Sequence, residues 1–224
     1  LRMVLSYAAT DMKGHVAHVR DPMSERRTQL LLMDISRAYF NAKTDDRDPV
    51  YVEFPPEAGA PQGMCGLLRR HMYGTRRAAE GWQDECSSSL VAMGFVQGSA
   101  SACVFMHRGK NIVLSVHGDD FTTTGPKCKL DEFEAELESK YELKRGGRLG
   151  PGDEDAKEIT VLNRVLRWTA SGVEYEADPR QGEKLLEGLG LDSGCKSTAT
   201  PGLKPMVDKL IEDKVLGVDS HTIF

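Results

Sequence analysis

The sequence predicts an α+β protein in which an antiparallel sheet carries helices on one face. The expected elements follow in the order helix, strand, strand, helix, strand hairpin, helix. Residues 28–36 form a nearly continuous apolar run, typical of a strand buried on both faces, and residues 77–93 show helical periodicity. Hydrophobic residues make up 40% of the chain and charged residues 28%, a balance typical of a globular protein.

Each element follows from its local pattern. In the clearest helix, at 77–93, the apolar residues recur at spacings of four, four and three, and Gly94 is its expected stop. This stripe consists of Trp82, Cys86, Leu90 and Met93. In chain order the expected elements are a helix at 1–10, a loop at 11–28, a strand at 28–36, a helical turn at 37–42, a strand near a sheet edge within 48–57, a short strand and turn within 63–75, the helix at 77–93, two or three strands within 102–125, a helix at 129–143, a hairpin within 158–178 and a helix at 179–191.

Two stretches indicate boundaries. The segment KRGGRLGPGDED (144–155) is rich in glycine and charge and is expected to be a flexible connection. Asp178 is expected to cap the helix at 179–191. About 30 residues at the C-terminal end of the sequence have weak periodicity and are expected to be poorly ordered.

Length and composition bound the class of protein. A chain of 224 residues makes one large domain or two small ones. The purely apolar runs, such as 30–33, are all far shorter than the roughly 20 residues of a membrane helix, and no signal peptide is visible. Five widely spaced cysteines without a CxxC argue against a disulfide framework or a zinc knuckle and fit a reducing compartment. The formal net charge of −5 does not itself predict nucleic-acid binding, but local clusters matter more than the mean.

Three carboxylates are expected at one edge of the sheet. Asp34 ends its strand, Asp119 and Asp120 stand together at the tip of an apolar hairpin, and no lysine is expected nearby. If those strands are neighbours, the three side chains converge. A Gly-Asp-Asp alone is more often an ordinary turn. Together with Asp34 and a basic segment between them, the pair favours a magnesium site, because magnesium prefers oxygen ligands and is held by carboxylates plus substrate phosphates.

The basic segment LLRRHMYGTRRAAEGW lies between these carboxylates in the chain. Its cationic residues are followed by no acidic residue until Glu80, and guanidinium groups suit phosphate contacts, although a solvated basic face is an equally simple interpretation. Tyr73 and Trp82 fit either base stacking or the core, and the position of Trp82 on the apolar stripe favours the core. The cationic residues are Arg69, Arg70, His71, Arg76 and Arg77.

The sequence resembles the reverse transcriptase domain of copia-type LTR retrotransposons over residues 1–203. The resemblance rests on six stretches that match successive family motifs in order: MDISRAYFNA, VYVEFPPE, LLRRHMYGTRRAAEGWQDE, SACVFMHRGKNIVLSVHGDDF, GVEYEADPRQGEKLLEGLGL and KSTATPGL. It implies a right-hand polymerase palm at 1–143, a palm end and thumb-like segment at 144–203, and a poorly ordered tail at 204–224. Fingers and RNase H are expected to lie outside this sequence.

The resemblance also implies roles for individual residues. Asp34, Asp119 and Asp120 would form the catalytic Mg²⁺ or Mn²⁺ site, with Asp120 beside the primer terminus. Tyr39 would exclude the ribose 2′-hydroxyl of the incoming nucleotide, with ordinary packing as the alternative. The other implied roles are nucleotide binding by Arg77, primer contact by His117 and Gly118, and nucleic-acid binding by Arg69, Arg70 and Arg76.

Two departures from the family pattern fall inside the motifs. His117 and Gly118 replace the family's Tyr and Val before the two aspartates, which puts the seating of the primer end in question. Arg77 replaces a Gln and Ala79 a Pro, which puts the nucleotide contact in question.

The implied function is RNA-directed DNA polymerase, a nucleotidyltransferase that extends a primer 3′-OH with dNTPs by two-metal-ion chemistry. Expected partners are an RNA or DNA template–primer, dNTPs, the rest of a Gag-Pol-type polyprotein with integrase and RNase H, or a second subunit, and no membrane. The expected location is a cytoplasmic virus-like particle or the nucleus.

The alternative functions are a decayed or domesticated palm that binds nucleic acid or a protein without polymerase activity, and an unrelated magnesium-dependent phosphohydrolase. The ordered motifs and the lack of a nucleophile motif argue against the latter.

Overall fold

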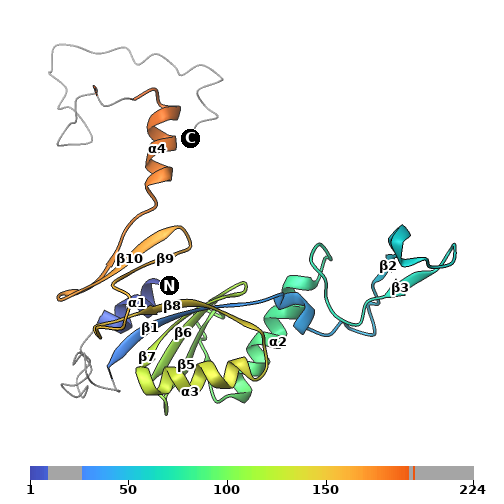
Figure 1. The fold of residues 1–224 in the computed structure, drawn as a ribbon, viewed down its shortest axis with the longest axis horizontal. Helices are drawn as coiled ribbons and strands as arrows, with labels where there is room; N and C mark the ends of the chain where they lie inside the picture. The colour runs from blue at the N-terminus through green and yellow to red at the C-terminus, as the bar shows by residue number, and fades with distance from the viewer. Residues whose placement is uncertain (10–26, 192–193, 195–224) are drawn as a thin grey trace. The chain divides into compact units, whose positions relative to one another are not determined.

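A computed structural model describes residues 1–9, 27–191 and 194 (Figure 1). The chain divides into two units, Leu1–Tyr175 and Glu176–Phe224. The elements of the first unit are α1 (Arg2–Ala9), β1 (Thr28–Ile35), η2 (Ala38–Asn41), β2 (Tyr51–Glu53), η3 (Pro56–Ala58), β3 (Cys65–Leu67), α2 (Ala78–Ala92), β4 (Val96–Gln97), β5 (Val104–His107), β6 (Ile112–His117), β7 (Asp120–Pro126), α3 (Lys127–Glu138), β8 (Leu143–Leu149), β9 (Glu158–Val161), β10 (Arg164–Thr169) and β11 (Gly172–Tyr175).

The second unit contributes one described helix, α4 (Pro179–Gly188). The side chain of Asp178 accepts a hydrogen bond from the backbone N–H of Arg180 at 3.1 Å, which confirms the expected N-cap. The tail predicted at 204–224 lies outside the described residues, as does most of the loop predicted at 11–28. Among the described helices, none is long and apolar enough to cross a membrane.

The first unit is built on a six-stranded sheet in the order β4-β5-β6-β7-β1-β8 (Figure 1). Every neighbouring pair in it is antiparallel. The predicted α+β class with an antiparallel sheet is therefore confirmed. The first strand of the chain, β1, lies between β7 and β8, so residues far apart in sequence meet along it.

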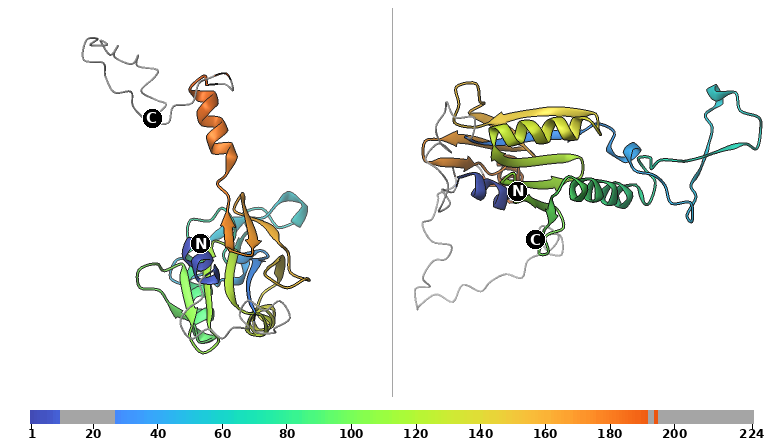
Figure 2. Two further views of the ribbon diagram at one scale, coloured as in Figure 1. Left: turned by 90° about the vertical axis from the view of Figure 1, so that its left-hand side faces the viewer. Right: turned by 90° about the horizontal axis from the view of Figure 1, so that it is seen from below.

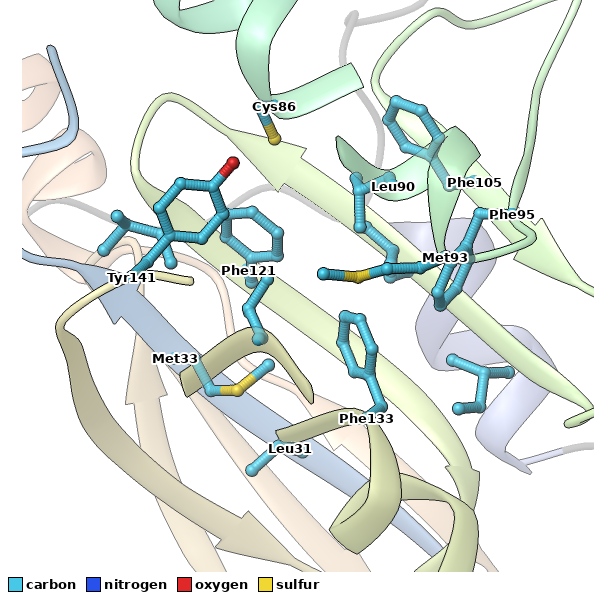
Figure 3. Packing of buried hydrophobic residues seen from close by; sticks show 14 of the residues in the cluster. Leu31, Met33, Cys86, Leu90, Met93, Phe95, Phe105, Phe121, Phe133 and Tyr141 are labelled. Carbon is cyan, nitrogen blue, oxygen red and sulfur yellow. The ribbon is translucent and has the colours of Figure 1, made fainter. Parts of the chain in front are cut away.

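Helices α2 and α3 cover one face of this sheet, and side chains of both, such as Leu90 and Phe133, lie in one buried cluster (Figure 3). Leu31, Met33 and Ile35 of β1 point to this face, because alternate residues of a strand share a face. The predicted stripe of α2 is buried here, and each large apolar side chain removed from water contributes roughly 1.5–3 kcal/mol. The stripe packs with Phe105, Phe121, Leu130, Phe133, Leu137 and Tyr141.

The opposite face is also covered, which corrects the prediction of helices on one face only. Leu30 and Leu32 of β1 pack there against Val4 and Leu5 of α1, so α1 and α3 lie on opposite sides of the sheet (Figure 2). A three-stranded sheet, β11-β10-β9, adds Leu166 to the same cluster. Because β1 is apolar on both faces, both faces need a covering layer.

The expected flexible connection at 144–155 is wrong over its first half. These residues form most of β8, which pairs with β1 from Leu30↔Leu149 to Ile35↔Leu143. The register shifts between Leu32 and Met33, and Gly147 in the shifted region has a positive φ of 110°. Glycines that read as flexible in the sequence instead permit a β-bulge. The division into a palm at 1–143 and a thumb-like segment at 144–203 stays a prediction.

Three smaller expectations are refined by the structure. The strands within 48–57 and 63–75 pair with each other as a separate two-stranded sheet instead of joining an edge of the main one. The hairpin within 158–178 has three strands, because Leu162 and Asn163, both with positive φ, form an additional turn. The stop of α2 is confirmed, since Gly94 has a φ of 92° and its N–H donates to the Val91 carbonyl at 2.9 Å.

Gly81 lets α2 pack against a buried histidine. A Cβ at this position would overlap the imidazole of His71, whose side chain is buried. We expect Gly81→Ala to lower the free energy of unfolding by about 1–2 kcal/mol, because overpacking outweighs the roughly 1 kcal/mol gain in helix propensity. Urea denaturation measures this change. In a His71→Ala background the same substitution should be neutral or stabilising, and an equal loss there would contradict the explanation.

Candidate active site

The structure brings the three predicted carboxylates to one edge of the sheet. Asp34 on β1 is the register partner of Asp120 on β7. Asp119 lies in the turn between β6 and β7, and its carbonyl accepts a hydrogen bond from the N–H of Ile35 at 3.0 Å. We refer to Asp34, Asp119 and Asp120 as the carboxylate edge. Strand pairing places these residues side by side although 85 positions of sequence separate Asp34 from Asp119.

The electrostatics of the carboxylate edge are those of crowded acids. Burial raises the pKa of Asp120, and the charges of Asp119 and Asp34 raise it further, while His117 lowers it. The Oδ1 atom of Asp34 is buried and has no hydrogen-bond partner among the described residues. An orphaned carboxylate oxygen and mutual repulsion are both relieved by a bound cation.

One basic residue lies closer than expected. Lys144 Nζ is 3.7 Å from Asp34 Oδ2, so the interpretation of these carboxylates as free of nearby lysine is wrong. The contact arises because β8 joins the sheet and pairs Lys144 with Asp34. The lysine is 68% exposed, and an ion pair this open to water is weak enough to be displaced by a divalent cation.

The residues present fit a magnesium site completed by a substrate. Among the described residues, no group of three or more His, Cys, Asp or Glu side chains is arranged to hold a metal ion by itself. Magnesium keeps waters and is usually held by one or two carboxylates plus substrate phosphates, so a preformed protein cage is not required. The carboxylate edge supplies the hard oxygen donors, and the orphaned Oδ1 of Asp34 is one of them.

The turn that carries Asp119 is supported from below by α2. Gly118 has a φ of 67°, and His117 and Asp120 pair on either side of a two-residue loop, a position where glycine is favoured. The indole N–H of Trp82 donates to the Gly118 carbonyl at 2.8 Å. Trp82 is only 2% exposed, so the predicted core position is confirmed. Its hydrogen bond to the turn has no signal in the sequence.

Trp82→Phe isolates this hydrogen bond. Phenylalanine keeps an apolar ring but leaves the Gly118 carbonyl without its donor, so we expect the free energy of unfolding to fall by about 1–3 kcal/mol. Chemical denaturation followed by circular dichroism measures the loss. The matched control is Trp168→Phe, whose indole N–H has no recorded partner among the described residues and which should lose less. Equal losses in the two variants would contradict the role of the bond.

Tyr39 lies on η2, the short helix that follows β1 and Asp34 in the chain. Its ring stacks on Tyr73, with centroids 4.3 Å apart and planes at 30°, and Phe40 meets Tyr73 edge-on. Tyr73 is 47% exposed, so it does not lie in the core. Its ring already stacks on Tyr39, so it is not free for base stacking on that side either. Tyr39 and Gly118 also line a pocket of about 240 Å³.

The predicted basic residues are partly neutralised by acids from the preceding loop. Arg77 pairs with Glu80 at 3.1 Å and with Asp48 at 3.6 Å. Arg69 is 3.9 Å from Asp46. The segment itself has no acid before Glu80, but the loop at 44–50 supplies Asp46 and Asp48 from elsewhere in the chain.

The other two arginines differ from each other. Arg70 donates to the backbone carbonyl of Asn41. Arg76 is exposed and has no ion pair recorded among the described residues. Of the four arginines predicted to contact nucleic acid or the nucleotide, Arg76 is the one most available to a phosphate. The roles predicted for all four stay predictions.

Comparison with known proteins agrees with the resemblance seen in the sequence. The chain is similar to the Retrovirus-related Pol polyprotein from transposon RE2 of Arabidopsis thaliana, at 28% identity over 106 residues. That match covers 45% of this chain and 7% of the polyprotein, so the chain spans a small part of that relative. Residues 23–151, more than half of the chain, match the family described as Reverse transcriptase (RNA-dependent DNA polymerase) and include the whole carboxylate edge. The predicted likeness to copia-type retrotransposon reverse transcriptases is confirmed, and the chain belongs to the reverse transcriptase family.

Proposed function

We propose that this chain is the palm-bearing part of an RNA-directed DNA polymerase, which adds dNTPs to a primer 3′-OH on an RNA or DNA template. The observation that carries the proposal is the register of β1 and β7, which sets Asp34 opposite Asp120 with Asp119 in the adjoining turn. Acids crowded on an accessible sheet edge are suited to nucleotidyl transfer, where positioning and electrostatic stabilisation supply most of the catalysis.

The carboxylate edge would hold the divalent cations. Two Mg²⁺ or Mn²⁺ ions, when bound, supply activation of the primer hydroxyl and neutralisation of charge on the leaving pyrophosphate. Asp34 and Asp119 are the proposed ligands, and Asp120 is the third carboxylate beside the primer terminus. The Trp82–Gly118 hydrogen bond holds the turn on which Asp119 sits, so α2 orients the ligands from behind.

The surrounding residues would orient the two substrates. Tyr39, which lines a pocket together with Gly118, would clash through its ring with a ribose 2′-hydroxyl and so favour deoxynucleotides. His117 and Gly118 would seat the primer terminus. Arg77 would contact the nucleotide after exchanging Glu80 or Asp48 for phosphate, since exposed ion pairs are weak. The proposed phosphate contacts to the template–primer are Arg69, Arg70 and Arg76.

A second candidate function is nucleic-acid binding without polymerisation. It is favoured by one observation, the replacement of the family's Tyr and Val by His117 and Gly118 directly before the ligands. In this case the chain would bind template–primer with an affinity that falls steeply with salt, because phosphate contacts release counterions. It would not extend the primer. In either case the proposed setting is a larger Pol-type polyprotein.

Primer extension distinguishes the two candidates. Poly(rA)/oligo(dT) and dTTP are supplied with Mg²⁺ or Mn²⁺, and binding is measured in parallel by fluorescence anisotropy over a series of salt concentrations. Extension that stops when the cation is chelated supports the polymerase. Salt-dependent binding without extension supports the second candidate. Absence of both binding and extension would overturn both proposals.

A further inference from the structure

The proposed sugar-excluding residue, Tyr39, has an aromatic neighbour that the reaction scheme does not use. Tyr73 stacks on it with ring centroids 4.3 Å apart, which is within the range of favourable aromatic pairs. Tyr73 comes from the turn before α2, whereas Tyr39 comes from η2 after β1. The contact therefore joins two segments that each carry part of the proposed nucleotide site.

Tyr73 is held in place by its own backbone. The N–H of Thr75 donates to the carbonyl of Met72 at 3.1 Å, and the Thr75 hydroxyl donates to the same carbonyl at 2.7 Å. Gly74 has a φ of 87°, as a type II turn requires at its third residue, so Tyr73 occupies the second. Because two hydrogen bonds from Thr75 close this turn, the backbone at Tyr73 is held firmly and its ring can support Tyr39.

The segment that carries Tyr73 is also tied to the end of η2. The N–H of His71 donates to the carbonyl of Ala42 at 3.0 Å. The guanidinium of Arg70 donates to the carbonyl of Asn41. These bonds fix the backbone on both sides of the stack, so the relative position of Tyr39 and Tyr73 is determined before any nucleotide binds.

Tyr39 also borders open space. The pocket of about 240 Å³ that it lines lies against α2 and the Gly118 turn, and none of its lining side chains is charged. Ala79 and Gly118, two small residues at its wall, leave this space unfilled. A tyrosine that borders an unfilled pocket has room to turn into it, and stacking on Tyr73 opposes that movement.

We propose that Tyr73 is a positioning residue for sugar selection: by stacking on Tyr39 it keeps that ring at the nucleotide site and out of the neighbouring pocket. This inference rests on the proposed function, since it assigns how the same site distinguishes dNTPs from rNTPs. It adds a specificity determinant outside the residues implied by the family resemblance.

The test is the ratio of kcat/KM for dTTP to that for UTP, measured by primer extension for the wild type and for Tyr73→Ala. We expect the ratio to fall about 10- to 100-fold, the scale on which small displacements of a positioned group act. Tyr73→Phe should restore it, because stacking needs the ring and not the hydroxyl. Phe54→Ala removes a comparably exposed aromatic, 43% exposed against 47%, away from the stack and should leave the ratio unchanged.

Two further variants separate a positioning role from a merely structural one. In a Tyr39→Ala background, Tyr73→Ala should cause no additional fall, because Tyr73 acts through Tyr39. Ala79→Leu, which fills part of the pocket, should recover part of the selectivity lost in Tyr73→Ala. An unchanged ratio in folded Tyr73→Ala, an additive fall in the double variant, or no recovery by Ala79→Leu would overturn the proposal. A wild-type chain that incorporates neither nucleotide would instead overturn the proposed function, and this inference with it.

Discussion

Replacing Asp119 with asparagine is expected to abolish primer extension while leaving the protein at least as stable as the wild type. The loss of activity should be at least about 10²–10³-fold, the scale seen when one preorganised electrostatic stabiliser is removed. Asparagine keeps the size of the side chain and the backbone carbonyl that accepts from Ile35, so the turn is preserved. What changes is one charge at the carboxylate edge.

The expected gain in stability has an electrostatic cause. Asp119 and Asp34 both contribute, after burial, to the raised pKa of Asp120, which means that the charged forms of these acids oppose one another in the folded state. Without a bound cation, neutralising Asp119 relieves part of this repulsion. Functional sites often lower the stability of the fold in exchange for activity, and the carboxylate edge is expected to do the same.

Three measurements check this prediction: extension on poly(rA)/oligo(dT), template–primer binding, and thermal unfolding in the absence of divalent cations. The control is Glu57→Gln in η3, an exposed acid distant from the carboxylate edge in sequence, which should retain extension. Full activity in Asp119→Asn would remove Asp119 from the proposed metal site. A large fall in its unfolding temperature would show that the carboxylate has a structural role instead.

Asp155→Ala is expected to cause the largest loss of stability, about 3 kcal/mol, by breaking a buried charge cluster. Asp155 is 6% exposed and Arg27 is 1% exposed. The carboxylate accepts from Arg27 Nε at 3.2 Å, from Gln29 Nε2 at 2.5 Å and from the N–H of Gly152 at 2.8 Å. Removing one partner of a buried pair costs about 3–5 kcal/mol. The lower value is expected because Glu154 still pairs with Arg27.

The same cluster predicts a pH dependence. Burial by itself would raise the pKa of Asp155, but the hydrogen bonds and charge of Arg27, with the bonds from Gly152 and Gln29, outweigh it and lower the pKa below its ordinary value. The unfolded chain therefore takes up the proton at higher pH than the folded one. The stabilisation is complete above the ordinary carboxyl pKa of about 4 and is lost as pH falls through the lowered folded value.

Urea denaturation of the wild type and Asp155→Ala from pH 7 to pH 3 measures both effects. The difference between the two proteins should be constant near neutral pH and shrink at the acidic end. Asp153→Ala is the matched control, because this aspartate lies in the same loop and is exposed. A difference between wild type and Asp155→Ala that grows with acidification would contradict the assigned direction of the pKa.

Local patterns predicted the elements that are decided by neighbouring residues. The stripe of α2, the strand at 28–36 and the cap at Asp178 all depend on residues within one or two turns of each other, so periodicity and turn chemistry suffice. The convergence of Asp34 with Asp119 and Asp120 was predicted only on the condition that their strands pair. The family resemblance then assigned their roles.

The sequence by itself determined the α+β class, the main elements and the identity of the three carboxylates. The tertiary structure alone decided that β8 joins the sheet and sets Lys144 against Asp34, that Arg27 and Asp155 form a buried pair, and that Trp82 and Tyr73 support the site from behind. The physical reason is the separation in sequence between the residues that make these contacts. These contacts join residues that lie 34 to 128 positions apart, and chain entropy makes such pairings depend on the whole packed core, which no local pattern records.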